Sequence, residues 1–151
     1  MPYIIPRIDP HNIESKDVSE KVLALDITDS VERYIKESQN QNQYQALTIG
    51  HIMAFTQAAW KLNPEHASDM EYVFAYCKTP DGSRQIIGVF ELYRRGDVKD
   101  SARFFQSAVD AEGRMIFLAI PADEAIWNKY VGLMLKPAKQ GEANPVRYYE
   151  Q

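Results

Sequence analysis

Short runs of hydrophobic residues, separated by polar turn residues, fill the chain from residue 70 to residue 120. Residues 79–83 and 110–113 have hairpin-turn chemistry, because each segment carries an aspartate followed by a glycine that can adopt a left-handed conformation. A longer charged connection spans residues 95–100. We predict a four-stranded antiparallel meander over about residues 70–120. Its strand-forming residues are Tyr72, Val73, Phe74, Tyr76, Ile86, Ile87, Val89, Phe90, Tyr93, Phe104, Phe105, Ile116 and Phe117.

Helical spacing of apolar residues flanks this region on both sides. The predicted helices cover residues 30–38, residues 48–62 and a segment that begins at about residue 121. In the first helix, Val31, Tyr34 and Ile35 share one face. Acidic Asp123 and Glu124 mark the start of the last helix, where they complement the helix dipole. The wide apolar face of the second helix predicts that it packs against the sheet.

The segment before the first helix fits two patterns. Val18, Val22 and Leu25 fit a helix, whereas Leu23, Leu25 and Ile27 alternate like a strand. We interpret the segment as a helix, which places two or three helices before the sheet and one after it. The predicted fold class is therefore α+β.

Length and composition indicate one domain. A chain of 151 residues can bury roughly 70% of the surface that its unfolded form exposes, enough for a core without disulfides or metals. We therefore treat residues 1–151 as a single domain. Prolines in residues 1–14 predict an extended amino-terminal arm, and residues 138–151 predict an extended carboxyl-terminal tail that docks through Val146, Tyr148 and Tyr149.

Charge and cysteine content exclude several classes of partner. The formal net charge is −4 and no run of Lys or Arg is present, which argues against nucleic acid or an anionic membrane surface as a partner. No apolar stretch approaches the roughly 18 residues of a membrane span. The single cysteine, Cys77, excludes an intramolecular disulfide and suits a reducing compartment. We expect a cytoplasmic protein.

Both faces of the predicted sheet are apolar. Tyr72, Phe74 and Tyr76 lie on one face of the first strand, and Val73 and Ala75 lie on the other. Two layers must therefore cover the sheet. Three modest helices leave part of it for the terminal arms, a partner, a second copy of the chain or a ligand cavity.

Charged residues inside the strands provide a second hypothesis. Glu91 and Arg103 fall opposite each other if the connection at residues 95–100 is symmetric. They would form either a structural cross-strand ion pair or, together with Tyr93, the polar lining of a cavity.

No catalytic or cofactor motif is present in the sequence. His11, His51 and His66 lack the spacing of a helical metal pair, and no phosphate-binding glycine loop or nucleophile elbow occurs. His66, with Glu65 and Asp69 nearby, is the best histidine for acid–base work, but a structural role explains it as well. We predict no catalytic residue, metal site or cofactor.

These patterns favour a non-enzymatic module that binds another protein or itself. An inhibitor or immunity protein, a chaperone or an assembly subunit would use an acidic surface and an aromatic-rich sheet face in this way. The alternative is a small-molecule enzyme or binding protein with a cavity over the sheet. The candidate ligand or partner contacts are Tyr72, Phe74, Tyr76, Glu91, Tyr93 and Arg103.

Overall fold

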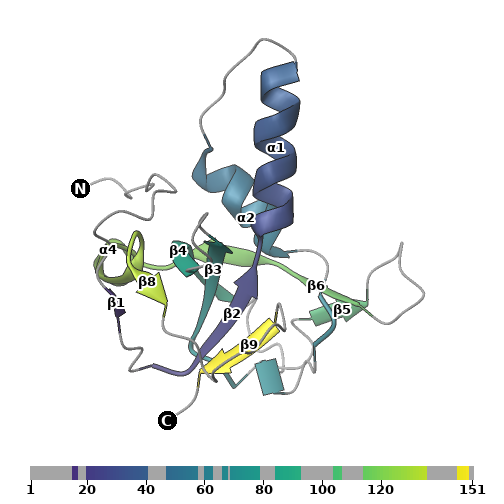
Figure 1. The fold of residues 1–151 in the computed structure, drawn as a ribbon. Coiled ribbons are helices and arrows are strands. Elements are labelled where there is room, and N and C mark those ends of the chain that lie inside the picture. Colours follow the sequence, from purple (N-terminus) through teal and green to yellow (C-terminus); the bar gives the residue numbers. More distant parts are fainter. Residues whose placement is uncertain are drawn as a thin grey trace.

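A computed structural model gives the fold of the chain as a mixed α+β structure (Figure 1). It describes residues 15–16, 20–40, 47–57, 60–62, 66–67, 69–78, 84–92, 104–106, 114–135 and 146–149. The helices are α1 (Thr28–Asn40), α2 (Ile49–Gln57) and α4 (Glu124–Tyr130). The strands are β1 (Ser15–Lys16), β2 (Val22–Asp26), β3 (Tyr72–Lys78), β4 (Arg84–Leu92), β5 (Phe104–Gln106), β6 (Met115–Phe117), β7 (Ala119–Pro121), β8 (Met134–Leu135) and β9 (Val146–Tyr149).

The main sheet has the strand order β1-β8-β4-β3-β2-β9, and β7 also pairs with β4. The pairs β2–β3 and β1–β8 are parallel, whereas β3–β4, β2–β9, β4–β7 and β4–β8 are antiparallel. Parallel strands cannot be joined by a tight hairpin, so the chain passes from β2 to β3 through α1 and α2. Both helices lie together on one side of the sheet in Figure 1.

The predicted four-stranded meander is not what the described residues form. Two of its pairings are present, because β3 pairs with β4 and β5 pairs with β6. The predicted pairing between the second and third strands, β4 and β5, is replaced. β4 pairs with β7 and β8, and β5–β6 is a separate two-stranded sheet. The predicted last strand is interrupted at Leu118, so it forms two strands, β6 and β7, of which only β7 pairs with β4 in the described part of the chain.

The interpretation of the segment before α1 as a helix is wrong at residues 22–26, because these residues form strand β2. This strand lies between β3 and β9, and the side chains from Val22 to Leu25 are 0% exposed. A strand that is covered on both faces has a continuous apolar run rather than clear alternation, so its sequence resembles that of a buried helix.

The predicted helices occur with different bounds. The first begins at Thr28, whose backbone N–H donates to the Asp26 carboxylate at 3.0 Å. The second is described as far as Gln57, and the backbone of Trp60 exchanges hydrogen bonds with Met115 at 2.9 and 2.7 Å. Trp60 is thus part of a β-bridge, although the predicted helix extended to residue 62.

The last helix begins three residues later than predicted, because Pro121 belongs to β7. The backbone N–H of Ala122 donates to Val89 O at 2.9 Å, and that of Gly132 donates to Ile86 O at 2.7 Å. α4 therefore lies along the edge of β4, between the β4 residues that pair with β7 and the β4 residue that pairs with β8. Gly132 has a φ of 95°, which favours glycine at this turn into β8.

The structure describes the predicted terminal segments only in part. The predicted amino-terminal arm, residues 1–14, lies outside the described residues, as do residues 138–145 of the predicted tail. The docking residues predicted in that tail lie in β9, which pairs with β2. The largest fully buried side chains of the core are Trp127, Arg147, Tyr76, Tyr130, Phe74 and Phe90.

Candidate functional site

The six predicted contact residues divide into three groups. Phe74 and Tyr76 are fully buried, and the ring of Phe74 packs on Tyr130 with centroids 4.9 Å apart. Both are therefore part of the core. Tyr72 and Glu91 are half-buried and reach the surface. Tyr93 and Arg103 lie outside the described residues, so the predicted Glu91–Arg103 pairing is not tested.

Strand register places Tyr72 and Glu91 on one face. Phe74 lies opposite Val89, and continuing this register brings Tyr72 opposite Glu91. Glu91 in turn lies opposite Ile120 of β7. Directly opposed residues of antiparallel strands point to the same side of the sheet, so the three side chains form a row across β3, β4 and β7.

The β7 end of this row is apolar and exposed. The side chains of Leu118 and Ile120 are 54% and 43% exposed, whereas Phe117 and Ala119 are buried. Leu118 lies between β6 and β7, and Ile120 lies within β7, so two large hydrophobic side chains reach water within three residues. We call Tyr72, Glu91, Leu118, Ile120 and exposed Asp123 the β7 surface.

The backbone of β7 is protected against pairing with a further strand. Pro121 has no N–H to donate, and the N–H of Ala119 already donates to the side-chain oxygen Oε1 of Gln57 at 2.8 Å. Proline and pre-satisfied donors are devices that block strand addition at a sheet edge. A partner of the β7 surface would therefore contact its side chains rather than extend its sheet.

Carboxylates give the β7 surface a negative character. Burial raises the pKa of the Tyr72 hydroxyl, and the charges of Glu91, Asp123, Glu20 and Glu71 raise it further, in that order. A phenolate at this position would be repelled by all four carboxylates. The same field attracts a cationic group brought up from solvent.

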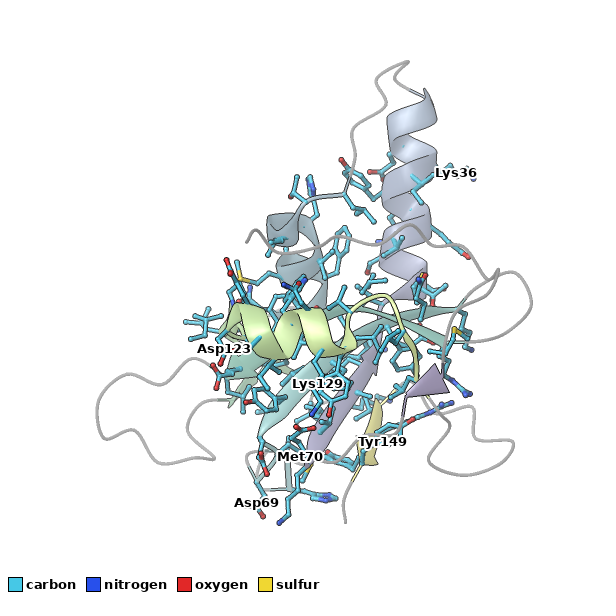
Figure 2. The ribbon with its side chains drawn as sticks, turned by 90° about the vertical axis from the view of Figure 1, so that its left-hand side faces the viewer. Lys36, Asp69, Met70, Asp123, Lys129 and Tyr149 are labelled. Carbon is cyan, nitrogen blue, oxygen red and sulfur yellow. The ribbon has the colours of Figure 1, made fainter. Side chains whose placement is uncertain are left out.

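One of these carboxylates has a clear structural role. Glu20 accepts a hydrogen bond from the Tyr130 hydroxyl and forms an ion pair with Lys129 at 3.3 Å. These contacts tie the end of α4 to the start of β2. In Figure 2, Asp123 lies at one end of α4 and Lys129 toward the other, so the acidic Asp123 end is separated from the lysine.

A second polar cluster lies within the core and was missed from the sequence. The Arg147 guanidinium lies 5.8 Å from the ring centroid of Tyr76, and the two side chains are 1% and 0% exposed. Burial raises the pKa of Tyr76 to about 12; Asp26 also raises it, whereas Arg147 and Arg84 lower it. Nothing in the tail sequence distinguishes Arg147 from a solvated arginine, because its burial depends on the pairing of β9 with β2.

The remaining reactive side chains have structural surroundings. His66 stacks on Tyr148 with ring centroids 3.8 Å apart, and His51 packs on Tyr34 at 4.5 Å. Burial raises the pKa of the Cys77 thiol to about 11, which keeps it protonated and poorly nucleophilic at neutral pH. Across the described segments, no group of three or more His, Cys, Asp or Glu side chains is arranged to hold a metal ion.

Comparison of the chain with protein-family models, with curated proteins and with solved structures gave no match. Among the helices in the described parts of the chain, none has the length and hydrophobicity needed to cross a membrane. The function must therefore be inferred from the geometry of the β7 surface and of the buried cluster.

Proposed function

We propose that the protein is a non-enzymatic interaction module that binds a basic protein partner through the β7 surface. The observation that carries this proposal is that Leu118 and Ile120 are exposed, that Glu91 lies opposite Ile120, and that exposed Asp123 follows three residues later. Single exposed hydrophobic residues are common, but two of them two residues apart, with carboxylates nearby, match the anatomy of a binding site.

The chemistry of the surface selects the kind of partner. Leu118 and Ile120 would supply apolar contact area, and each is expected to be worth about 1–2 kcal/mol when covered by a partner. Glu91 and Asp123 would favour lysine or arginine at the border of the contact and accelerate association at low salt. An inhibitor, an immunity protein, a chaperone or an assembly subunit would each use a surface of this kind.

Affinity purification of full-length protein from the cells that naturally make it tests this proposal. Three tagged proteins are compared at low and moderate salt: the wild type, the double variant Leu118→Thr/Ile120→Thr and the control Ile35→Gln. Ile35 is a suitable control because it is 37% exposed but lies on α1. Threonine preserves strand propensity at Ile120 in β7, and Leu118 is exposed between β6 and β7, so the fold is expected to survive.

The proposal predicts a stoichiometric basic companion with the wild type and the control. The double variant should lose this companion, and higher salt should weaken its binding to the wild type. A companion that binds all three proteins equally would show that the β7 surface is not the binding site. The absence of any companion for the correctly folded wild type would contradict the proposed function itself.

A further inference from the structure

Glu91 lies at the centre of the β7 surface, between an aromatic and an aliphatic side chain. Continuing the β3–β4 register brings Tyr72 opposite Glu91 on one side, and Ile120 of β7 is opposite it on the other. Opposed side chains on neighbouring antiparallel strands are about 5 Å apart and point to the same side of the sheet. One extended side chain of a partner can therefore contact all three. Because the β7 backbone is protected against strand addition, recognition on this row depends on side chains.

The Glu91 carboxylate is half-buried and, among the described residues, has neither a hydrogen-bond donor nor an ion-pair partner. Lys129 on neighbouring α4 is already paired with Glu20 at 3.3 Å. A carboxylate that has lost part of its hydration without gaining a counter-ion is suited to a cation brought by a partner. The new contact costs little further desolvation and adds a charge-assisted hydrogen bond.

The electrostatic surroundings of Tyr72 agree with this geometry. Burial and then the negative charges of four carboxylates, with Glu91 first among them, raise the pKa of the Tyr72 hydroxyl. The phenol is therefore neutral at physiological pH, and its ring lies in a negative field. The face of such a ring attracts a cation, and the carboxylate beside it attracts the same cation.

We propose that the partner of the β7 surface lays an arginine side chain along this row, with its guanidinium against the Glu91 carboxylate and the Tyr72 ring and its aliphatic stem along Ile120. This inference rests on the proposed function, since it specifies which group of the basic partner makes the central contact. A guanidinium suits the row better than an ammonium, because it pairs with both carboxylate oxygens, stacks on aromatic rings and is more weakly hydrated. Its methylene stem packs on apolar surface.

Selection of random peptides on the immobilised full-length protein tests this contact without the natural partner. A displayed library of random peptides is selected in parallel on the wild type and on the double variant Leu118→Thr/Ile120→Thr. Peptides enriched only on the wild type bind the β7 surface. The best of them are synthesised with each arginine replaced by citrulline, its neutral isostere, or by lysine, and isothermal titration calorimetry gives the Kd of each peptide.

The expected result is an arginine whose replacement by citrulline weakens binding about tenfold or more, as expected for loss of a charge-assisted hydrogen bond. Lysine at the same place should recover only part of the affinity. In the protein, Glu91→Gln should weaken Kd by about tenfold and Tyr72→Leu by about threefold. The control Glu37→Gln removes the same charge from an exposed position on α1, next to Lys36, which lies far from Asp123 in Figure 2; it should leave Kd unchanged.

The inference is overturned if the selected peptides keep their affinity when arginine is replaced by citrulline, or when Glu91 is replaced by glutamine. Equal binding of arginine and lysine peptides would also overturn it, since the row would then recognise charge alone. These outcomes leave the proposed function intact, because the peptides still depend on Leu118 and Ile120. A library that yields no peptide specific to the wild type would instead contradict the β7 surface as a binding site, and with it both proposals.

Discussion

Gly88 of β4 lies against Ile52 of α2, and its replacement by alanine tests this packing. A Cβ atom at Gly88 would lie 2.7 Å from Cε2 of Phe90 and 2.9 Å from Cγ2 of Ile52. Real Cβ atoms essentially never approach other atoms this closely, so α2 or the Phe90 ring would have to move. The residue is in the middle of β4, opposite Ala75 of β3.

We expect Gly88→Ala to lower the free energy of unfolding by about 1–3 kcal/mol, the usual cost of adding a methyl group to a packed core. The control is Gly50→Ala at the start of α2, where the nearest atom to a new Cβ, Oγ1 of Thr48, is 3.6 Å away. Because alanine favours helix over glycine, this control should be neutral or more stable by up to about 1 kcal/mol.

Urea unfolding followed by circular dichroism and tryptophan fluorescence measures both changes. A double variant with Phe90→Leu, which removes the clashing ring, should recover at least about 0.5 kcal/mol of the loss relative to additivity. A Gly88→Ala protein as stable as the wild type would refute the packing of α2 on β4. Equal shifts at Gly88 and Gly50 would point to a general glycine effect instead.

Two further predictions concern a helix end and the single cysteine. Asp123→Ala should destabilise the protein by about 1 kcal/mol in urea unfolding, because its carboxylate accepts the Ile126 N–H at 3.0 Å at the start of α4; an unchanged midpoint would show that this cap is dispensable. Cys77 should react with a thiol reagent at pH 8 far more slowly in the folded protein than in urea. Its pKa rises from 9.0 to about 11 on folding, so its contribution to stability is complete below pH 9 and is lost as the pH rises through 11. Cys77→Val should remove that part of the pH dependence, and rapid native labelling would contradict the burial.

The sequence predicted local structure well where one pattern was unopposed. The spacing of Val31, Tyr34 and Ile35 predicted α1, and acidic Asp123 predicted the start of α4 to within a few residues. The turn residues predicted the β3–β4 and β5–β6 pairings. Each of these signals lies within a short stretch of chain, so it does not depend on distant partners.

Pairings between distant segments were not predictable in the same way. β2 lies next to both β3 and β9, and its continuous apolar run fits a helix as readily as a strand that is buried on both faces. We expected β4 to pair with the strand now labelled β5, but it pairs with β7. β7 is separate from β6 because the strand is interrupted at Leu118, and no turn residue marks that position.

The candidate site was predicted only in part. Glu91 and Tyr72 were named from the sequence, but their neighbour Ile120 was not, since its exposure depends on the split between β6 and β7. The four residues from Phe117 to Ile120 are all apolar, so the sequence does not show which of them are exposed. The sequence likewise does not show that Arg147 is buried.

Photo-crosslinking in the cells that naturally make the protein tests the interaction surface most directly. A photoreactive amino acid is placed at Ile120 in one protein and, as the control, at Ile35 in another; both side chains are exposed. The proposed function predicts one dominant crosslinked partner from position 120, basic in composition and reduced by added salt, and none of it from position 35. Equal crosslinking from both positions, or none from position 120, would contradict a binding site at the β7 surface.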